Sequence, residues 1–270
     1  MSLPFPALQS LSISIDDDTE HLLLPFLARL GVPALDELTI RYDIRLSVTV
    51  DRRLPATQIH DVLLNVSRST RMRSFTLQGF ELAAPPEDEH VLDLSILAPL
   101  LSLHDLETLE MRGVPVLLSS DDAATVARSW PKLRYLRICD KVRFEEPLRR
   151  RLLQADDLLP FARHCPKLET LGLPLEIVAT SVPAGAPDLP PPSRIHKLCV
   201  AGVAERVSRD MLELFTRVFP WADVRAPSHS AGEAIWNLSV RGDLTDEDED
   251  HEGEEEVEHE RDEDESAEES

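Results

Sequence analysis

Apolar residues recur along the chain in a fixed short pattern. Seven segments carry an apolar residue, two variable residues, a second apolar residue, one variable residue and a third apolar residue. The first apolar positions, which are 27 to 37 residues apart, are Leu8, Leu35, Met72, Leu106, Leu133, Leu168 and Ile195. Each copy predicts a short strand, because successive side chains of a strand point to opposite faces.

The segments between these copies have apolar residues three or four positions apart, which is the spacing of an amphipathic helix. The clearest are residues 21–30, 59–67, 122–130, 157–165 and 209–219. Side chains that can cap a helix lie at residues 16–19 and 119–122 and at Asp156 and Asp157. Pro25 and Pro160 lie shortly after two of these predicted starts. Proline is tolerated there because the first backbone N–H groups of a helix have no acceptor within the helix. We therefore expect helices between the strands.

A strand, a turn and a helix of this length are too small to bury their own apolar face, so such units must stack on one another. The pattern predicts a curved α/β solenoid of about seven units within residues 1–242. The second and third apolar residues of each strand would face the helices, and the residues between them would form a concave sheet. We also expect an extra strand at 44–50, an irregular loop at 183–193 and a closing strand at 235–240.

Charge divides the chain into two parts. The formal net charge is −22, and residues 243–270 contain 18 acidic residues and one basic residue, Arg261. A segment of this composition cannot bury enough apolar surface to offset its ordering entropy, so we expect a disordered acidic tail at 243–270. The remaining 242 residues carry a net charge of only −5 and can form a sizeable core. This balance argues against direct nucleic-acid binding, which depends on clustered cations.

The seven copies, together with the string DLLPFARHCPKLETLGLPL, resemble the leucine-rich repeats of basidiomycete F-box-like proteins. The resemblance covers roughly residues 4 to 201 and implies an irregular horseshoe. It also implies that the chain delivers protein targets to a cullin-RING ubiquitin ligase. An F-box is an N-terminal helical module of about 40 residues, whereas this chain opens on its first repeat, so adaptor binding is expected only if an F-box lies upstream. No polar cap precedes Leu8, and we expect a partner or a missing segment to cover the first repeat.

The variable strand positions are the candidate binding residues, because solenoids build extended binding surfaces from them. We expect a protein target on this concave face, centred on repeats four and five, where Tyr and Arg residues of the kind that dominate interfaces gather. The candidates are Ser12, Glu37, Thr39, Arg41, Thr76, Gln78, Glu110, Arg112, Tyr135, Arg137, Thr170 and Lys197. The alternative for any one of them is a solvated side chain without a binding role.

We expect no catalytic activity, cofactor or metal site. The chain has no GxSxG, Gly-rich phosphate loop or HExxH motif. His164 and Cys165 are adjacent but would point to different sides of a helix, so packing at the helix end is the simpler interpretation. The acidic run at 246–257 lacks the Gly and the final Glu of a calcium loop.

The first ten residues lack the pattern of a secretory signal, and the longest apolar stretch, 96–103, is interrupted by Pro99. We therefore expect an intracellular protein, cytoplasmic or nuclear, without a membrane span. The basic residues Lys141, Arg143, Arg149, Arg150 and Arg151 form either a solvated loop or a site for the acidic tail.

Two functions remain open at this point. One is a substrate-binding repeat region of an F-box-like ubiquitin-ligase receptor. The other is a free acidic leucine-rich-repeat protein that binds histones or other basic proteins through its tail, which is also suited to phosphorylation by an acid-directed kinase.

Overall fold

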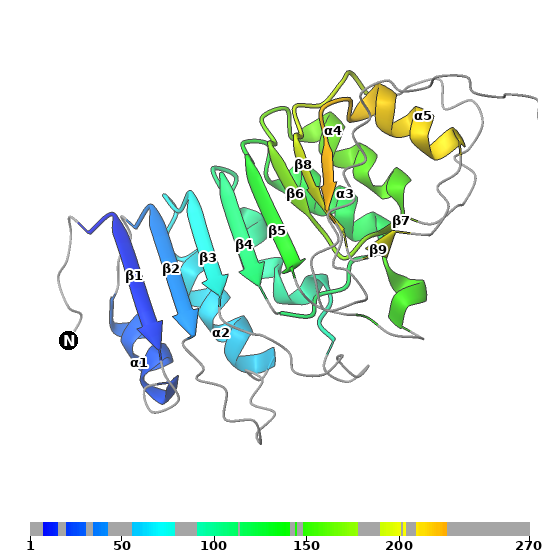
Figure 1. Cartoon of the computed structure of the whole chain (residues 1–270). Coiled ribbons are helices and arrows are strands. Elements are labelled where there is room, and N and C mark those ends of the chain that lie inside the picture. Colours follow the sequence, from blue (N-terminus) through cyan, green and yellow to red (C-terminus); the bar gives the residue numbers. More distant parts are fainter. Residues whose placement is uncertain are drawn as a thin grey trace, which may run out of the picture.

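The strands predicted from the apolar spacing lie side by side in one parallel sheet (Figure 1). We describe a computed structural model of the chain, in which residues 8–15, 20–30, 35–42, 56–78, 91–112, 114–140, 144, 148–177, 190–200, 202–203 and 209–225 are described. Eight strands follow one another in chain order: β1 (Ser10–Ile15), β2 (Glu37–Tyr42), β3 (Ser74–Gln78), β4 (Thr108–Arg112), β5 (Tyr135–Asp140), β6 (Thr170–Gly172), β8 (Lys197–Cys199) and β10 (Asp223–Arg225). The α/β class and the seven predicted strands are confirmed.

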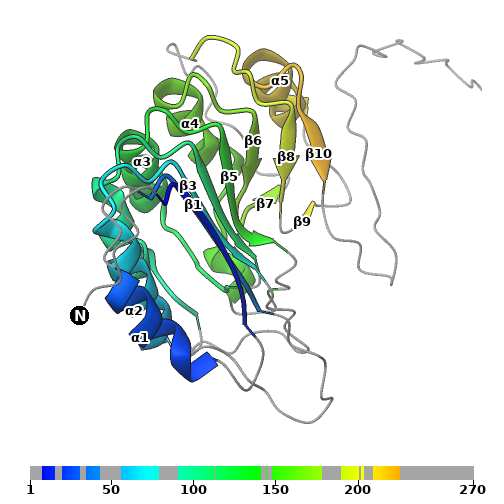
Figure 2. The ribbon, with the colours of Figure 1, turned by 90° about the vertical axis from the view of Figure 1, so that its left-hand side faces the viewer.

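Helices cover one face of this sheet (Figure 2). They are α1 (Glu20–Leu30), α2 (Ala56–Ser67), α3 (Ser120–Ser129) and α4 (Leu159–His164), and a further helix, α5 (Arg209–Val218), precedes β10. The structure also contains the short 3-10 helices η2 (Leu94–Ile96), η3 (Ala98–Ser102), η4 (Leu148–Arg151) and η5 (Ala155–Leu158). None of the described helices covers the opposite face of the eight-stranded sheet, which we call the open face.

Backbone register aligns the apolar pattern from strand to strand. Leu109 of β4 pairs with Phe75 of β3 on one side and with Leu136 of β5 on the other. All three side chains are fully buried against the helices. The same alignment runs from Leu11 in β1 to Val224 in β10. A continuous apolar row therefore lies under the sheet, while the residues between its members belong to the open face.

The strands are also tied together where they begin. Thr108 N–H donates to the Arg73 carbonyl at 2.9 Å, and Tyr135 N–H donates to the Glu107 carbonyl at 3.0 Å. The corresponding hydrogen bond is present between each described pair of neighbouring strands, up to Asp223 N–H and the His196 carbonyl. These hydrogen bonds keep the starts of neighbouring strands in register.

Three helix ends are built alike. Trp130, Cys165 and Phe219 follow α3, α4 and α5, and each is buried and precedes a proline. The indole N–H of Trp130 donates to the Leu100 carbonyl at 3.0 Å, and the Cys165 thiol lies 3.4 Å from the Ala127 carbonyl. Each of these two residues therefore ends its own helix through its backbone N–H, while its side chain donates to a carbonyl of the preceding segment.

The predicted helix starts are only partly right. At α3 the Ser119 hydroxyl accepts from Asp122 N–H at 3.2 Å, while the Asp122 carboxylate accepts from Ser119 N–H at 2.9 Å, as expected of a capping pair. The helical segment that leads into α4 begins with η5, about one turn earlier than predicted. There the Asp157 carboxylate accepts from Gln154 N–H. Pro25 lies inside α1 and not at its first turn.

In the described part of the connection between β3 and β4, residues 91–107, the helical segments are the 3-10 helices η2 and η3 and not an α-helix. Pro99 lies in the first turn of η3 and cannot donate a backbone hydrogen bond. A second small sheet pairs β7 (Glu176–Ile177) with β9 (Gly202–Val203), which the apolar pattern does not predict. The loop expected at 183–193 is irregular over its described part, residues 190–193, whereas the strands expected at 44–50 and 235–240 and the acidic tail at 243–270 lie outside the described residues.

Candidate functional site

Register brings the predicted binding residues into three rows on the open face. Glu110 of β4 pairs with Thr76 on one side and with Arg137 on the other, and Tyr135 pairs with Thr170. Lys197 continues the row that contains Tyr135 and Thr170. Parallel pairing in register therefore places predicted residues that are 27 to 37 positions apart in the sequence on neighbouring strands.

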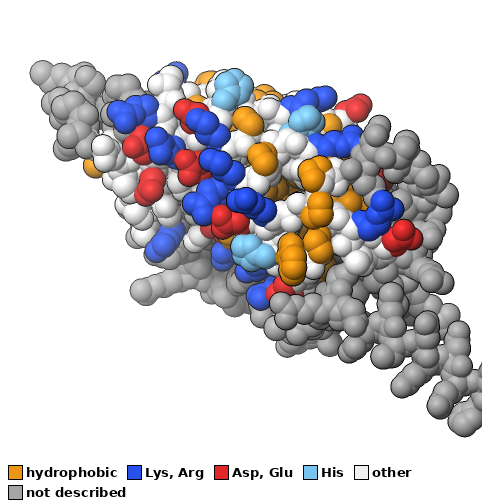
Figure 3. All heavy atoms as spheres, turned by 90° about the horizontal axis from the view of Figure 1, so that it is seen from above, with side chains coloured by type: hydrophobic (Ala, Val, Ile, Leu, Met, Phe, Trp, Pro, Cys, Tyr) orange, Lys and Arg blue, Asp and Glu red, His pale blue; other side chains and the backbone are white. Residues whose placement is uncertain are grey.

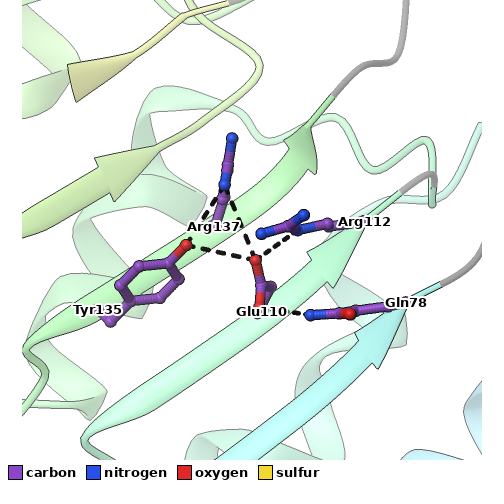
Figure 4. A network of polar contacts seen from close by, with 5 residues as sticks. All are labelled: Gln78, Glu110, Arg112, Tyr135 and Arg137. Carbon is purple, nitrogen blue, oxygen red and sulfur yellow. Dashed lines mark hydrogen bonds and ion pairs between the residues drawn. The ribbon is translucent and has the colours of Figure 1, made fainter. Parts of the chain in front are cut away.

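Five predicted residues meet at the centre of this face, on β3, β4 and β5 (Figure 4). Glu110 is the common acceptor. Gln78 Nε2 donates to Glu110 Oε2 at 2.9 Å, and Arg112 Nε donates to Glu110 Oε1 at 2.5 Å. The Tyr135 hydroxyl donates to the same Oε1 at 3.3 Å. We call Gln78, Glu110, Arg112, Tyr135 and Arg137 the central network.

Arg137 completes the network from the far side of Tyr135. Its Nη1 lies 3.4 Å from the Tyr135 hydroxyl and 3.9 Å from Glu110 Oε1. The side chains of Arg137 and Glu110 are only 15% and 9% exposed, whereas that of Arg112 is 35% exposed. Two guanidinium groups thus contact one carboxylate in a place where water screens charge weakly.

A glycine makes room for Arg137. Gly172 of β6 pairs with Arg137 in the sheet, and a Cβ built on Gly172 would lie 2.9 Å from Arg137 Cγ and 3.3 Å from Cys199 Cβ. Contacts that short require the neighbours to move. The missing side chain therefore allows the stem of Arg137 to lie against β6. Gly172 was not among the predicted residues, because its role depends on the pairing with β5.

The remaining predicted residues lie around the centre without joining it. Thr76 and Thr170 are buried, Thr39 is half-buried and Arg41 is exposed. Ser12 and Glu37, on the first two strands, are exposed. Lys197 is half-buried, and among the residues that the structure describes neither Arg41 nor Lys197 has an ion-pair partner. The open face therefore has one connected centre and two free cations on its flanks.

The last strand extends the face beyond the predicted set. In β10, Asp223 pairs with Lys197 and Arg225 with Cys199, and Arg225 Nε donates to Asp223 Oδ2 at 2.9 Å. The seven-copy pattern does not predict this strand, because the buried residues Ala222 and Val224 are two positions apart and the pattern requires three. The pair Phe219-Pro220 is the signal that could have found it, since Trp130-Pro131 and Cys165-Pro166 precede β5 and β6 in the same way.

Burial determines the chemistry of the Cys165 thiol. Cys165 is buried, and desolvation raises the pKa of its thiol to about 12, so the thiol stays protonated and cannot act as a nucleophile near neutral pH. Within the described ranges no group of three or more His, Cys, Asp or Glu side chains is arranged to hold a metal ion. None of the described helices combines the length and the apolar character needed to cross a membrane.

The predicted basic loop is described only in part. Arg150 and Arg151 are exposed, whereas Lys141, Arg143 and the side chain of Arg149 lie outside the described residues. The expectation that this loop binds the acidic tail therefore stays a prediction.

Comparison of the chain with protein-family models and with curated proteins found no match.

Proposed function

We propose that this protein is a non-enzymatic recognition module that binds a protein target on the open face. The observation that carries this proposal is the central network, in which side chains from three neighbouring strands share the carboxylate of Glu110. A surface that serves only as a solvated exterior has no need of a half-buried Arg and Tyr held in one geometry.

The types of residue in the network support binding of a protein. Tyr and Arg are the residues that most often dominate interface energies, and they do so near the centre of the contact. Here Tyr135 and Arg137 are already ordered by hydrogen bonds, so a partner would meet side chains that lose little further conformational entropy. The flanking residues Thr39, Thr76 and Thr170 are small, which leaves the centre accessible along the sheet.

We further propose that the fold is a leucine-rich-repeat solenoid and that the module serves an F-box-like ubiquitin-ligase receptor inside the cell. The parallel sheet in chain order and the recurring hydrogen bonds at the strand starts support the repeat assignment. The ligase role rests on the resemblance of the sequence alone. It is tested by pull-down from the native cell, in which failure to recover a cullin-RING adaptor would remove the ligase role and leave target binding untouched.

Site-directed cross-linking tests target binding. A photoreactive phenylalanine at position 135 should give a discrete cross-linked product with one protein in the native cell. The matched control carries the same residue at Leu64, which is exposed on α2 on the helical side of the sheet. Substitution of Arg112 and Arg137 by Ala should abolish the product formed from position 135.

Products of equal yield from positions 135 and 64, or a product that persists when both arginines are replaced, would contradict the proposal. A product formed only from position 64 would move the binding surface to the helices.

The acidic tail favours one second candidate function. With 18 acidic residues among residues 243–270, the chain could bind histones or other basic proteins through the tail without use of the open face. Histone affinity measured with and without residues 243–270 separates the two functions, because only this candidate requires the tail.

A further inference from the structure

We propose that two copies of this chain associate through strand β1, in antiparallel pairing about a twofold axis at Ser12. β1 lies at one end of the eight-stranded sheet (Figure 1), and among the described strands it pairs with β2 alone. The interaction surface is the edge of the sheet and not the open face, so the association itself does not depend on the function proposed above.

The two edge strands of the sheet differ in how they are protected. An exposed strand edge can pair with another chain, and proteins usually discourage this with short strands, charges or proline. β10 has three residues, and it carries the ion pair of Asp223 and Arg225. β1 has six residues, SLSISI, with neither a charge nor a proline. The edge of β1 is therefore the one that can accept a further strand.

The hydrogen bonds to β2 show which backbone groups of β1 remain for a partner. The Gln9 carbonyl accepts from Glu37 N–H at 2.9 Å, so it points toward β2. Backbone groups alternate in direction along a strand, so the N–H and carbonyl groups of Ser10, Ser12 and Ser14 point to the outer edge. None of the described segments forms a backbone ladder with this outer edge.

These directions fix the register of a second β1 strand. In an antiparallel pair, opposite residues whose backbone groups point at each other exchange two hydrogen bonds. A twofold axis at Ser12 places this residue opposite its own copy and places Ser10 opposite Ser14. Leu11 then lies opposite Ile13 of the second copy, on the side of the helices. Serines meet serines and apolar residues meet apolar residues, which is the self-complementarity that a twofold interface requires.

Apolar side chains at this end of the molecule also favour a covering partner. Leu11 and Ile13 pack against the core but are only partly buried. Two of the four large apolar side chains described as exposed, Leu22 and Phe26, lie one turn apart on α1, in the same strand-helix unit. A second copy would cover Leu11 and Ile13 with the same two residues of its own first strand, and burial of apolar area stabilises such an interface.

The edge formed by the strand starts, which we call the strand-start edge, is the competing surface for self-association. Figure 3 shows basic and acidic side chains intermingled on it. Several of its charges are paired within the chain, for example Lys132 with Asp105 at 2.6 Å and Arg134 with Glu169 at 2.6 Å. Exposed charges of this kind contribute little to an interface in salt, so the strand-start edge is the less favoured surface.

Association through β1 would join the two sheets into one. A twofold axis perpendicular to the sheet keeps both sets of helices on one side and both open faces on the other. The two central networks would then face the same way, and a target with two binding segments would gain affinity from both. This consequence rests on the proposed function, whereas the association can be measured without a target.

Charge at position 12 tests the axis, because this residue faces its own copy in the dimer. Sedimentation equilibrium of the full chain should show a dimer that dissociates on dilution. Ser12→Lys and Ser12→Glu should each weaken the association at least about tenfold, because like charges meet at the axis. An equal mixture of the two variants should restore the dimer, which also shows that both variants fold. Ser12→Gln, of similar length but uncharged, is the matched control and should retain the dimer.

Disulfide formation tests the register. Cys139→Ser and Cys199→Ser leave the buried Cys165 as the only other thiol. In this background Ser12→Cys should link two chains on oxidation, because the Cα atoms of such a pair lie about 5.5 Å apart, within the range of a disulfide. Ser10→Cys is the matched control and should not link two chains, because the two copies of this residue would lie about 14 Å apart along the strands.

A chain that stays monomeric at every concentration measured would overturn the proposal. A dimer that withstands Ser12→Lys, or a mixture of the two charged variants that fails to associate, would also overturn it, since either result places the contact elsewhere. Cross-linking of Ser10→Cys without that of Ser12→Cys would overturn the register. Recovery of a single copy from the native cell with another protein paired to β1 would overturn association of the chain with itself. None of these results bears on target binding at the open face.

Discussion

The first strand and the central strands follow the same sequence pattern but are packed very differently. In β1, Leu11 and Ile13 are only partly buried, and Leu22 on α1 is 52% exposed. In β4 and β5, Leu109 and Leu136 are fully buried. The difference comes from the number of neighbours: among the described strands β1 pairs with β2 alone, whereas each central strand pairs on both sides.

This comparison bears on where the candidate binding residues lie. An apolar side chain in a stacked fold is buried by the units before and after it, so stability is greatest away from the ends. The central network lies on β3, β4 and β5, directly over the most completely buried part of the apolar row. The proposed recognition surface would therefore keep its geometry when the ends of the sheet fluctuate.

The largest expected contrast is between Trp130 and Ile13. Trp130→Ala should lower the free energy of unfolding by about 3–5 kcal/mol, because it leaves a cavity and removes the hydrogen bond from the indole to the Leu100 carbonyl. Ile13→Ala in β1 should cost less than about 2 kcal/mol, because that side chain is already partly exposed. Urea unfolding followed by circular dichroism measures both, and similar losses for the two variants would contradict the contrast between centre and edge.

Gly172→Ala should cost about 1–3 kcal/mol, because the new methyl group would overlap Arg137 Cγ. The cost should fall when Arg137 is also changed to Ala, since the closest contact is then removed. Cys199 would still be near, so relief should be partial. A double-mutant cycle of unfolding free energies tests this, and strictly additive effects would show that Gly172 does not position Arg137.

Glu110→Gln should lower the unfolding free energy by about 1–2 kcal/mol, because the carboxylate accepts from Gln78, Arg112 and Tyr135 and is only 9% exposed. Partial exposure of Arg112 keeps the loss below that of a fully buried ion pair. The matched control is Glu37→Gln on β2, which is exposed and should change stability by less than about 0.5 kcal/mol. Equal losses of unfolding free energy in the two variants would show that Glu110 contributes no more to stability than an exposed glutamate.

The smallest expected effect is at the exposed pair of Asp105 and Lys132. The hydrogen bond from Lys132 lowers the pKa of Asp105 below its usual value. A lowered pKa in the folded state stabilises the protein above the unfolded value near 3.9, and this contribution is lost as the pH falls through the folded value. Lys132→Met should therefore alter the pH dependence of unfolding only at acidic pH. A difference that persisted unchanged to the lowest pH would contradict this assignment.

Local periodicity was sufficient to predict the strands but not every connection. Apolar spacing predicts β1 to β6 and β8, because burial of alternate side chains acts strand by strand. It misses β10, where the interval from Ala222 to Val224 is one residue short, and it does not predict the 3-10 helices η2 and η3. Those features depend on how neighbouring segments pack, which a single unit of the pattern does not contain.

The candidate site was predictable as a surface and not as a network. Alternation places Glu110, Arg112, Tyr135 and Arg137 on one face. That Glu110 accepts from three strands at once, and that Gly172 leaves space for Arg137, follows from strand register and could not be derived from residue spacing. The shift in register between Met111 and Arg112, which pairs Arg112 with Asp140, is a further feature of this kind.

Hydroxyl-radical footprinting of the complex with the cross-linked target tests most directly whether the open face is the binding surface. Tyr135 lies at the centre of that face, and Trp221, which is 65% exposed in the turn before β10, lies at the strand-start edge. Binding should protect Tyr135 from oxidation and leave Trp221 unchanged. Protection of Trp221 with unchanged oxidation of Tyr135 would contradict the account.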